Sequence, residues 1–406
     1  MSNICRVSGD PLELVVDFGR QPLGNGFLNQ EDFKNEYFFN MQCGFTEKSK
    51  MFQLINQPNP EIMFHENYAF FSSTSNYMKK HFYNFYESII NSDYLSNDPF
   101  IIELGCNDGI MLENFANNNF KHLGIEPSKN VAIEANKKGV RTISDFFDNS
   151  VANKIIADFG QADCFISANV MCHIPNIHSV AEGISKILKT TGVLIFEDPY
   201  LGDVIEKTSY DQIYDEHVFL FSAHSVQYLF SNYNLELINL EPQVTHGGSM
   251  RYTLAHKGMY EINPNVKKYL SKEKLQGLDK VETFHNFQSK IIESKNKLLD
   301  LLNSLKKDGH HVFGYAATSK STTILNYCGI TNDLIGKIYD TTPIKHGKFS
   351  PGMHIPILNY EEFKNEKAKY GFLFAWNHSK EIIEKETHYK SQGGHWITHV
   401  PEVMAF

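Results

Sequence analysis

Two separate stretches of the chain alternate short apolar strands with amphipathic helices, and this alternation is the strongest constraint on the fold. Strand patterns in the first stretch cover residues 99–105, 122–126, 163–167 and 192–197. Apolar residues recur at helical spacing over 76–90, 129–138 and 177–188. Because strands that alternate with helices form a parallel sheet covered on both faces, the chain is predicted to be an α/β protein.

The second stretch begins at residues 311–315, and its later strand patterns cover 334–339, 370–376 and 397–404. Between the two stretches, residues 261–308 are rich in Lys and Glu with Leu and Ile at helical spacing, which predicts long connecting helices. The first sixty residues are rich in turns and predict a small module. We therefore expect a small N-terminal module, a first α/β domain, a helical connector and a second α/β domain, covering 1–65, 66–260, 261–308 and 309–406.

The composition excludes several classes of protein. The 406 residues include 38 Lys and Arg against 47 Asp and Glu, a net charge of −9, so the chain lacks the basic excess that nucleic acids or anionic membranes require. No apolar run is long enough for a membrane span, and the N-terminus does not have the layout of a signal peptide. The six scattered cysteines do not form a disulfide framework. We expect a cytoplasmic enzyme or binding protein with reduced thiols.

The most specific local motif directly follows the first predicted strand and reads Glu103-Leu104-Gly105-Cys106-Asn107-Asp108-Gly109. A glycine-containing turn at this place in a doubly wound sheet lets the backbone approach a ligand. The second strand ends in Glu126, followed by Pro127-Ser128, and such an acid can accept both ribose hydroxyls of an adenosine ligand. The motif resembles the S-adenosylmethionine site of class I methyltransferases, whereas the glycine register does not fit a nicotinamide cofactor. The alternative is a structural turn with a coincidental acid.

Polar residues are densest in three later segments: Glu197-Asp198-Pro199-Tyr200-Leu201, Ser209 to His217, and His246-Gly247-Gly248-Ser249-Met250-Arg251. The second segment places a phenol, a carboxylate and an imidazole within four residues, at Tyr214, Glu216 and His217. An enzyme that removes a proton next to a ketone needs a base, a group that orients it and a donor for the enolate oxygen. A polar loop that satisfies its own hydrogen bonds is the alternative.

Taken together, these segments resemble the nucleotide-sugar C-methyltransferases that make branched 4-keto-deoxysugars. The resemblance includes Tyr-Asp-Gln-Ile-Tyr-Asp-Glu-His at 210–217, His-Gly-Gly-Ser-Met-Arg at 246–251 and Ala-Asn-Val-Met-Cys-His at 168–173. It continues in the second α/β stretch through segments 314–320, 326–329, 351–356 and 375–377, so that it runs from about residue 5 to residue 401. It implies a class I (Rossmann-like) methyltransferase domain, a second Rossmann-like α/β domain that holds the nucleotide sugar, and S-adenosylmethionine as the cofactor.

The resemblance also implies a role for each matching residue. His217 would be the general base, with Tyr214, Glu216 and His173 in the same cavity. The cofactor would contact Tyr68, Phe71, Ser72, Glu103, Gly105, Asn107, Asp108, Gly109, Glu126, Pro127, Ser128 and Asn169. The substrate would contact Tyr200, His246, Gly247, Ser249, Arg251, Ser319, Lys320, Lys345 and Asn377, with Ser319 and the two lysines facing phosphate charge. For Ser319 and Lys320 the alternative is an ordinary strand-to-helix turn.

The N-terminal module departs from the family pattern, which has two Cys-x-x-Cys pairs that bind zinc. The first pair is Cys5-x-x-Ser8 in this chain, and the second is Thr46-x-x-Ser49. Hydroxyls bind zinc far more weakly than thiolates do. We therefore predict a module without metal; a different site formed by Cys5, Cys43, His65 and an acid is the alternative.

The resemblance implies that His217 removes the proton next to the C4 ketone of a nucleotide-linked 4-keto-6-deoxy sugar, and that C3 then receives the methyl group. An O- or N-methyltransferase would share the cofactor motif without needing a carbon-acid base. A dehydratase or epimerase would need a nicotinamide fingerprint, and a non-catalytic binding protein would not need the polar segments. The chain is expected to be a monomer or a homodimer, with no nucleic-acid or membrane partner.

Overall fold

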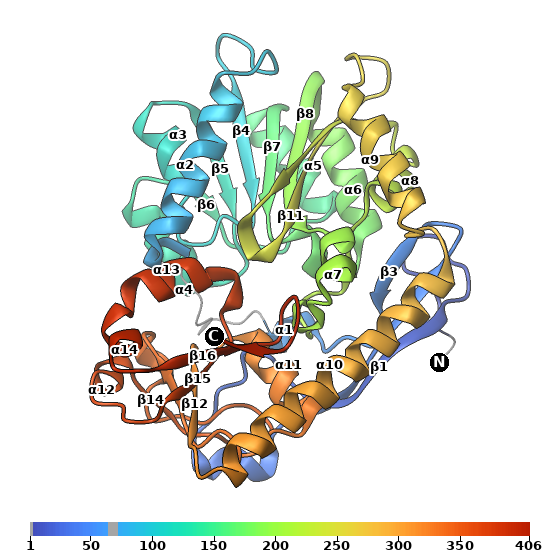
Figure 1. The fold of residues 1–406 in the computed structure, drawn as a ribbon. Coiled ribbons are helices and arrows are strands. Elements are labelled where there is room, and N and C mark those ends of the chain that lie inside the picture. The colour runs from blue at the N-terminus through green and yellow to red at the C-terminus, as the bar shows by residue number, and fades with distance from the viewer. Residues whose placement is uncertain (1–2, 64–71) are drawn as a thin grey trace.

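The computed structural model describes residues 3–63 and 72–406, which form three β-sheets connected by helices (Figure 1). Two of the sheets are doubly wound α/β sheets, and the third belongs to the N-terminal region. The predicted α/β class is confirmed. None of the helices in the described part of the chain is both long enough and apolar enough to cross a bilayer.

The first large sheet has the strand order β10-β11-β8-β7-β4-β5-β6. Its strands are β4 (Phe100–Leu104), β5 (Lys121–Ile125), β6 (Thr142–Ile143), β7 (Ala162–Ala168), β8 (Leu188–Pro199), β10 (Leu235–Gln243) and β11 (Ser249–His256). The prediction of a purely parallel sheet is wrong at one edge, where β11 runs antiparallel to both of its neighbours. The parallel strands reverse their order at β4, which lies between β5 and β7, and ligands bind at such a switch point.

Both faces of this sheet are covered by helices, as the continuous apolar pattern of β4 requires. Alternate residues of β4 point to opposite faces, so that Ile101 and Ile102 belong to two different apolar clusters. The first face packs against α2 (Asn76–Ile90), α3 (Leu112–Asn117) and α4 (Lys129–Lys137). The second packs against α5 (Asn149–Phe159), α6 (Ile177–Ile187) and α8 (Ala223–Ser231), while the shorter α7 (Leu201–Lys207) follows β8. The predicted helices at 76–90, 129–138 and 177–188 are thus present.

The second large sheet has the strand order β14-β13-β12-β15-β16-β17. Its strands are β12 (Val312–Tyr315), β13 (Ile338–Asp340), β14 (Ile357–Asn359), β15 (Tyr370–Leu373), β16 (His395–Thr398) and β17 (Met404–Ala405). Its helices are α11 (Ser319–Cys328), α12 (Tyr360–Phe363), α13 (Ser379–Lys385) and α14 (Thr387–Ser391). The single strand expected at 397–404 is wrong, because the chain turns at 399–403 and β17 pairs antiparallel with β16.

The N-terminal region forms a four-stranded antiparallel sheet that recruits a strand from far along the chain. Its own strands are β1 (Glu13–Pro22), β2 (Phe38–Thr46) and β3 (Met51–Leu54), followed by the short helix α1 (Pro60–Met63). The fourth strand is β9 (Phe219–Leu220), which pairs with β3. The brief extended runs expected from the sequence are therefore longer strands, and the N-terminal sheet is incomplete without residues of the first α/β unit.

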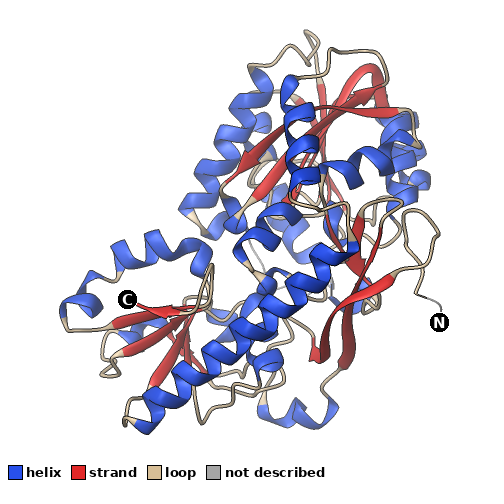
Figure 2. Ribbon diagram, turned by 45° about the vertical axis from the view of Figure 1, so that its right-hand side comes forward, coloured by secondary structure: helices blue, strands red, loops and turns tan. Residues whose placement is uncertain are grey.

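Two helices connect the large sheets, as predicted: α9 (Pro264–Leu275) and α10 (Val281–Lys307). The long helix α10 passes between the N-terminal strands and the second large sheet (Figure 2). Its Gln288 accepts the backbone N–H of Asp17, and its Lys295 donates to the carbonyl oxygen of Tyr327 in α11. The remaining turns include the 3-10 helices η1 (Gln30–Asn35), η2 (Ser72–Thr74), η3 (Met171–His173), η4 (Tyr210–Gln212), η5 (Thr245–Gly247), η6 (Pro343–Lys345) and η7 (Trp376–His378).

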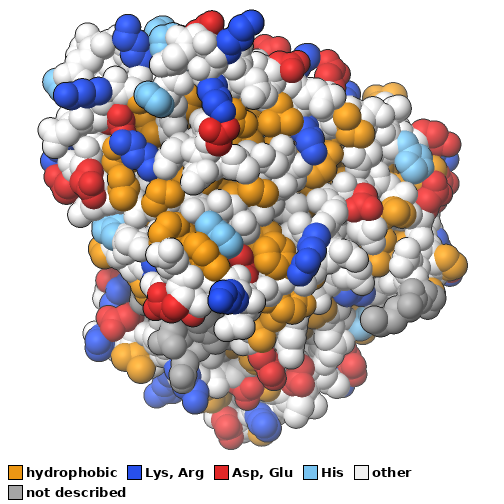
Figure 3. Space-filling view, turned by 90° about the horizontal axis from the view of Figure 1, so that it is seen from below, with side chains coloured by type: hydrophobic (Ala, Val, Ile, Leu, Met, Phe, Trp, Pro, Cys, Tyr) orange, Lys and Arg blue, Asp and Glu red, His pale blue; other side chains and the backbone are white. Residues whose placement is uncertain are grey.

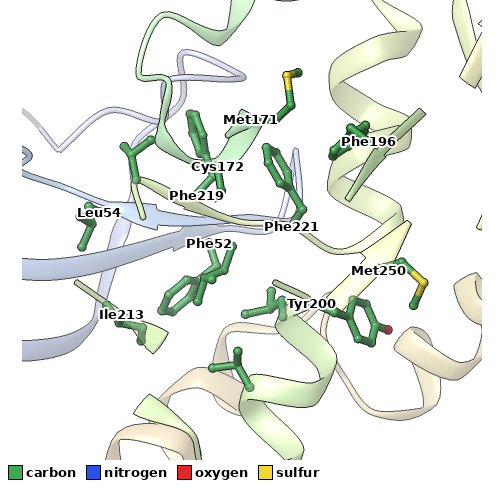
Figure 4. Close-up of a cluster of buried hydrophobic side chains, with 14 of the residues drawn as sticks. Phe52, Leu54, Met171, Cys172, Phe196, Tyr200, Ile213, Phe219, Phe221 and Met250 are labelled. Carbon is green, nitrogen blue, oxygen red and sulfur yellow. The ribbon is translucent and has the colours of Figure 1, made fainter. Parts of the chain in front are cut away.

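A cluster of buried apolar side chains joins the N-terminal sheet to the first large sheet (Figure 4). Phe52 and Leu54 of β3 lie in this cluster with Phe219 of β9 and Ile213, and all four are almost fully buried. Burying such side chains stabilises a fold by roughly 1.5–3 kcal/mol each.

On the surface seen in Figure 3, acidic and basic side chains are interspersed, in keeping with the modest net charge of −9.

Candidate active site

A cavity of about 650 Å³ opens at the carboxyl ends of the central strands of the first large sheet. All three sheet regions contribute to its lining. The first large sheet provides Leu104, Gly105, Glu126 and Asn169, the second provides Ser319, Lys320, Lys345 and Asn377, and the N-terminal region provides Asn25, Asn59 and Pro60. The cavity is large enough for two ligands of moderate size to meet.

The loop after β4 turns sharply and brings backbone to the cavity wall. Gly105 has a φ of +70°, and a Cβ atom there would overlap Val170 Cγ2. Asn107 also has a positive φ, 49°, which Asn tolerates better than most residues. The turn therefore requires glycine at 105 and favours asparagine or glycine at 107, which accounts for the sequence motif at these two positions.

Glu126 follows β5 and lies at the cavity wall beside this loop. Its carboxylate accepts the backbone N–H of Asn107 at 3.0 Å and that of Ser128 at 2.9 Å. Burial raises the pKa of Glu126, while these two donors favour its anionic form. Each oxygen keeps a second lone pair, so the carboxylate can still accept hydroxyl donors from a ligand.

The structure separates the predicted cofactor residues into two groups. Ser72, Gly105, Asn107, Glu126, Pro127 and Asn169 line the cavity. Glu103, Asp108, Gly109 and Ser128 lie behind the lining and support it; Asp108, for example, accepts the backbone N–H of Ser73 at 3.2 Å. Tyr68 and Phe71 lie outside the described residues.

These residues fit S-adenosylmethionine. The open cradle at Gly105 admits a ligand close to the backbone, and Glu126 can accept ribose hydroxyls. In addition, the side-chain oxygen of Asn169 is buried without a hydrogen-bond partner in the described structure, as expected of an acceptor that serves a ligand.

The segment after η4 carries the proposed base, His217. Its Nδ1 lies 2.6 Å from the carbonyl oxygen of Gln212, and because a carbonyl oxygen can only accept, Nδ1 carries the proton. The lone pair of Nε2 therefore faces the hydroxyl of Tyr214, 2.7 Å away. The imidazole is held in the tautomer that a base needs, with a phenol beside the basic nitrogen.

Burial keeps three histidines of this cavity uncharged. It lowers the pKa of His173 to about 4 and, with the help of the Lys320 charge, that of His246 to about 3. Burial and the neighbouring His173 hold the pKa of His217 well below its usual value. The rings of His173 and His217 lie 5.2 Å apart, so they form one neutral, proton-accepting wall.

Two residues that the sequence did not single out contact the acids next to His217. The side-chain amide of Asn25 donates to Glu216 at 2.7 Å, and the backbone N–H of Gly24 donates to Asp215 at 2.9 Å. Burial raises the pKa of Asp215 to about 7. The sequence marks residues 24–26 only as a turn, because no local pattern shows what a turn touches.

The second large sheet contributes Ser319, Lys320, Lys345 and Asn377, all of which line the cavity as predicted. The two lysines differ. Lys345 donates to the carbonyl oxygen of Ala317 at 2.7 Å and lies 3.8 Å from Asp340, so its charge is used within the fold. Lys320 makes none of the ion pairs found among the described residues, and burial lowers its pKa. Lys320 is therefore the better candidate for meeting an anionic ligand.

Several predicted substrate residues lie outside the cavity lining. Tyr200 is buried and its hydroxyl donates to Glu273, and Ser249 donates to the carbonyl oxygen of Thr245. Arg251 forms an ion pair with the buried Glu197 at 2.9 Å. Burial alone would raise the pKa of Glu197, but the contacts with His81 and Arg251 help to lower it to about 2. Ser249 and Arg251 lie on β11 and Tyr200 lies between β8 and α7, and all three side chains make their contacts behind the cavity lining.

His246, which precedes these residues, does line the cavity. The next residue, Gly247, lies outside the lining and packs against the ring of Trp376. A Cβ atom at Gly247, which has a φ of +84°, would overlap the Trp376 ring. Trp376 in turn donates to Asp211 at 2.6 Å. The second large sheet thus fixes the loop that presents His246.

The N-terminal residues that correspond to zinc ligands do not fit zinc. Cys5 and Ser49 are buried with Sγ and Oγ 3.4 Å apart, which is a thiol–hydroxyl contact. Ser8 and Thr46 accept backbone N–H groups of Asp10 and Lys48 within their own turns. With one thiol and three hydroxyls, the donor set lacks the thiolates and imidazoles that hold zinc.

Among the described residues, three potential metal ligands approach one another: His173 and His217 of the cavity lining and the fully buried Cys172, with ligand atoms within 4.8 Å. Burial raises the pKa of the Cys172 thiol well above its usual value, so it stays protonated and is a poor ligand.

Comparison with known proteins supports this picture over the whole chain. C-methyltransferase NovU of Streptomyces niveus is 30% identical over 401 residues, which is 98% of this chain and 95% of NovU. The chain belongs to the C-methyltransferase family. Three family models match successive parts of the chain: "Putative zinc binding domain" at 5–64, "Methyltransferase domain" at 79–240 and "C-methyltransferase C-terminal domain" at 244–401. The protein is an S-adenosylmethionine-dependent C-methyltransferase, as the sequence motifs predicted.

Two solved structures that are similar to this chain each cover less than half of it. Magnesium protoporphyrin IX methyltransferase of Synechocystis PCC 6803, with bound S-adenosylmethionine, covers 44% of this chain and 79% of its own, with 10% identity and a TM-score of 0.33. A methyltransferase from Anabaena variabilis ATCC 29413 covers 45% of this chain and 86% of its own, with 15% identity and a TM-score of 0.36.

Proposed function

We propose that this C-methyltransferase acts on a nucleotide-linked 4-keto-6-deoxy sugar and methylates C3 through an enolate. The observation that carries the proposal is the His217 tautomer: a neutral imidazole with its Nε2 lone pair turned toward the Tyr214 hydroxyl in a cavity shared by both α/β units. A carbon nucleophile next to a ketone needs both a base that removes the proton and a hydrogen-bond donor that stabilises the enolate, and His217 and Tyr214 offer this pair; a hydroxyl nucleophile would need only the base, and an amine needs neither.

In the proposed reaction, His217 Nε2 accepts the proton from sugar C3, and the electron pair of that C–H bond moves toward the C4 ketone. When the sugar is bound, the Tyr214 hydroxyl turns from Nε2 to the developing enolate oxygen and donates its hydrogen bond there, which leaves the Nε2 lone pair open to the C3 proton; Glu216 and His173 orient the sugar and the base. Gly105, Glu126 and Asn169 would hold S-adenosylmethionine, which supplies the electrophilic methyl group that C3 takes. No metal takes part in this scheme.

The nucleotide is proposed to lie against the second large sheet. Lys320 lies at the start of α11, where the positive end of the helix adds to its ammonium charge, and Ser319 and Asn377 flank it in the lining. A diphosphate in this place would also raise the pKa of His217, because a nearby negative charge favours the protonated imidazole. The pKa of His217, which burial lowers, would thereby move back toward neutral pH.

We also propose a cytoplasmic location for the protein. The proposal further includes four parts, with boundaries near residues 65, 260 and 308, and a monomeric or homodimeric state.

The test is solvent deuterium exchange into a panel of nucleotide 4-keto-6-deoxy sugars, with and without S-adenosylmethionine, followed by mass spectrometry. We expect exchange at C3 without the methyl donor, and a product one methylene heavier with it. His217→Asn, which keeps the size and polarity of the side chain, should abolish both while leaving cofactor binding unchanged. Methylation without exchange would favour an O- or N-methyltransferase, and retained turnover in His217→Asn would reassign the base.

A further inference from the structure

The segment that carries His217 is held by the N-terminal region at its downstream end. Strand β9 begins two residues after His217 and pairs with β3, with Phe52 opposite Leu220. Immediately before β9, the carbonyl oxygen of Val218 accepts the backbone N–H of Leu54 at 2.8 Å. Phe52, Leu54 and Phe219 bury their side chains together (Figure 4). The end of the catalytic segment is thus part of the N-terminal sheet.

A second contact reaches the catalytic segment from the turn that follows β1. Residues 23–26 form this turn, closed by the Gly26 N–H, which donates to Leu23 at 3.1 Å. Gly24 lies between the two α/β units: its N–H donates to Asp215, and its carbonyl oxygen accepts the hydroxyl of Thr322 in α11 at 2.8 Å. A Cβ atom on Gly24 would lie 2.7 Å from the Asp215 carboxylate and 3.1 Å from Ser319 Cβ, so a larger residue would have to displace both side chains.

The next residue of the turn, Asn25, lines the cavity and donates its side-chain amide to Glu216 Oε1 at 2.7 Å. The geometry points to Asn25 as a positioning residue for Glu216, supplied to the active site by the N-terminal region. This inference rests on the proposed function, in which Glu216 orients the sugar and the base. It gives the N-terminal region a role in the reaction that does not require zinc.

The charges around this contact decide how a substitution will behave. From its own segment, Glu216 faces Asp215 and His217; from α11 it faces the ammonium of Lys320, and from η3 it faces Cys172 and His173. Burial lowers the pKa of Lys320, while the Asp211 and Glu216 charges oppose that shift, and the pKa values of His173 and His217 are also lowered by burial. A new carboxylate at position 25 would therefore meet Glu216 directly.

The first arm of the test measures turnover of Asn25→Ala against the matched control Asn56→Ala. Asn56 is an exposed asparagine of the same region whose amide donates to Asn40, outside the cavity lining. We expect kcat of Asn25→Ala to fall about 10- to 100-fold, because misplacing a group that orients the reacting atoms has effects of that size. The KM for S-adenosylmethionine should not change, and Asn56→Ala should match the wild type. An unchanged kcat in Asn25→Ala would overturn the inference.

The second arm uses Asn25→Asp and the pH profile of kcat. Two carboxylates in hydrogen-bond contact cannot both ionise easily, so the pair would retain a proton to a higher pH, and the acid limb of the profile should move up by about one pH unit or more. A role limited to folding would lower kcat at all pH values without moving this limb. An unmoved limb would therefore contradict positioning through Glu216.

The third arm does not depend on the acceptor. The difference in Tm between Asn25→Asp and the wild type should grow from pH 5.5 to pH 8, because the two carboxylates repel once both are ionised. Wild-type protein that neither exchanges nor methylates any sugar of the panel would refute the proposed function, whereas a Tm difference independent of pH would refute the Asn25–Glu216 contact itself.

Discussion

The loop after β4, in the first large sheet, and the loop after β12, in the second, begin with the same hydrogen bond. The N–H of Gly105 donates to the carbonyl oxygen of Ile125, and the N–H of Ala316 donates to that of Tyr339, each at 2.8 Å. In both sheets the neighbouring strand then leads into an acid. The strand orders around β4 and β12 also correspond, so the two loops occupy equivalent switch points.

The two acids, Glu126 and Asp340, accept similar hydrogen bonds from the backbone but differ in the side chains around them. Glu126 accepts two backbone N–H donors, as described above, and Asp340 accepts those of Ala317 and Thr342, each at 2.7 Å. Only Glu126 lines the cavity, while Asp340 is covered by Lys345. The comparison teaches that the fold fixes where the acid lies, whereas the cavity lining contains the acid itself in the first sheet and a lysine 3.8 Å from the acid in the second.

The central strands differ too. One residue before Leu104 the first sheet has the buried acid Glu103, whereas the equivalent residue in the second sheet is Gly314. A Cβ atom on Gly314 would lie 2.5 Å from the Phe374 ring. The first loop is thus supported by a carboxyl group and the second by an aromatic ring, and substitutions in the two halves should have different consequences.

The largest effect is expected for Gly105→Ala. The new methyl group would overlap Val170, and the φ of +70° is unfavourable for alanine. Together these effects should lower the free energy of unfolding by about 2–5 kcal/mol. Chemical denaturation measures this, with Gly9→Ala as a control, because Gly9 has a similar φ of +71° but open space around it. Equal losses in the two variants would mean that Val170 moves aside.

The next effect is expected for Glu103→Gln and depends on pH. Burial raises the pKa of Glu103 from 4.5 to about 8, so between these values the folded protein holds a proton that the unfolded chain has released. The wild type therefore loses stability as pH rises from 4.5 to 8, on the order of 1 kcal/mol per pH unit, and is level above pH 8. Gln cannot titrate, so the advantage of Glu103→Gln should grow over this range. A stability difference that is constant with pH would contradict this assignment.

A smaller effect is expected for Glu126→Gln, measured as the Kd for S-adenosylmethionine by titration calorimetry. Hydrogen bonds to a charged group contribute about 1.5–3 kcal/mol, so the affinity should fall roughly 10- to 100-fold. Asp340→Asn, the equivalent change in the second sheet, should leave this Kd unchanged. Equal losses in the two variants would remove the distinction between the acids.

The smallest effect is expected for Ala316→Gly, the reverse of the first substitution. Ala316 has a φ of 71°, which costs an alanine about 1–2 kcal/mol, and glycine relieves this at an entropic cost of about 0.5–1 kcal/mol. The variant should be more stable than the wild type, by about 1.5 kcal/mol at most. Thermal unfolding followed by circular dichroism checks the sign; a loss of stability would show that the Ala316 methyl group makes a contact that outweighs the strain.

The sequence predicted the parts of the site that local rules control. The glycine and asparagine of the first loop are dictated by backbone angles, and Glu126 by its place after the second strand. Sequence pattern did not separate Lys320 from Lys345, or show that Arg251 and Tyr200 support the wall, because the partner of a long side chain depends on distant segments. The pairing of β9 with β3 was missed for the same reason: two residues are too short to show a strand pattern, and the pairing joins distant parts of the chain.

That pairing has a consequence for how the chain reaches its folded state. During synthesis, β1 to β3 emerge early, but β3 keeps an unpaired edge until β9 has been made and has closed a very long loop. Contacts of such high sequence separation form slowly, and an exposed strand edge invites association with other chains. The catalytic segment should therefore be among the last to become ordered, and the first sixty residues cannot be deleted without leaving the edge of β9 and the Phe219 side chain exposed.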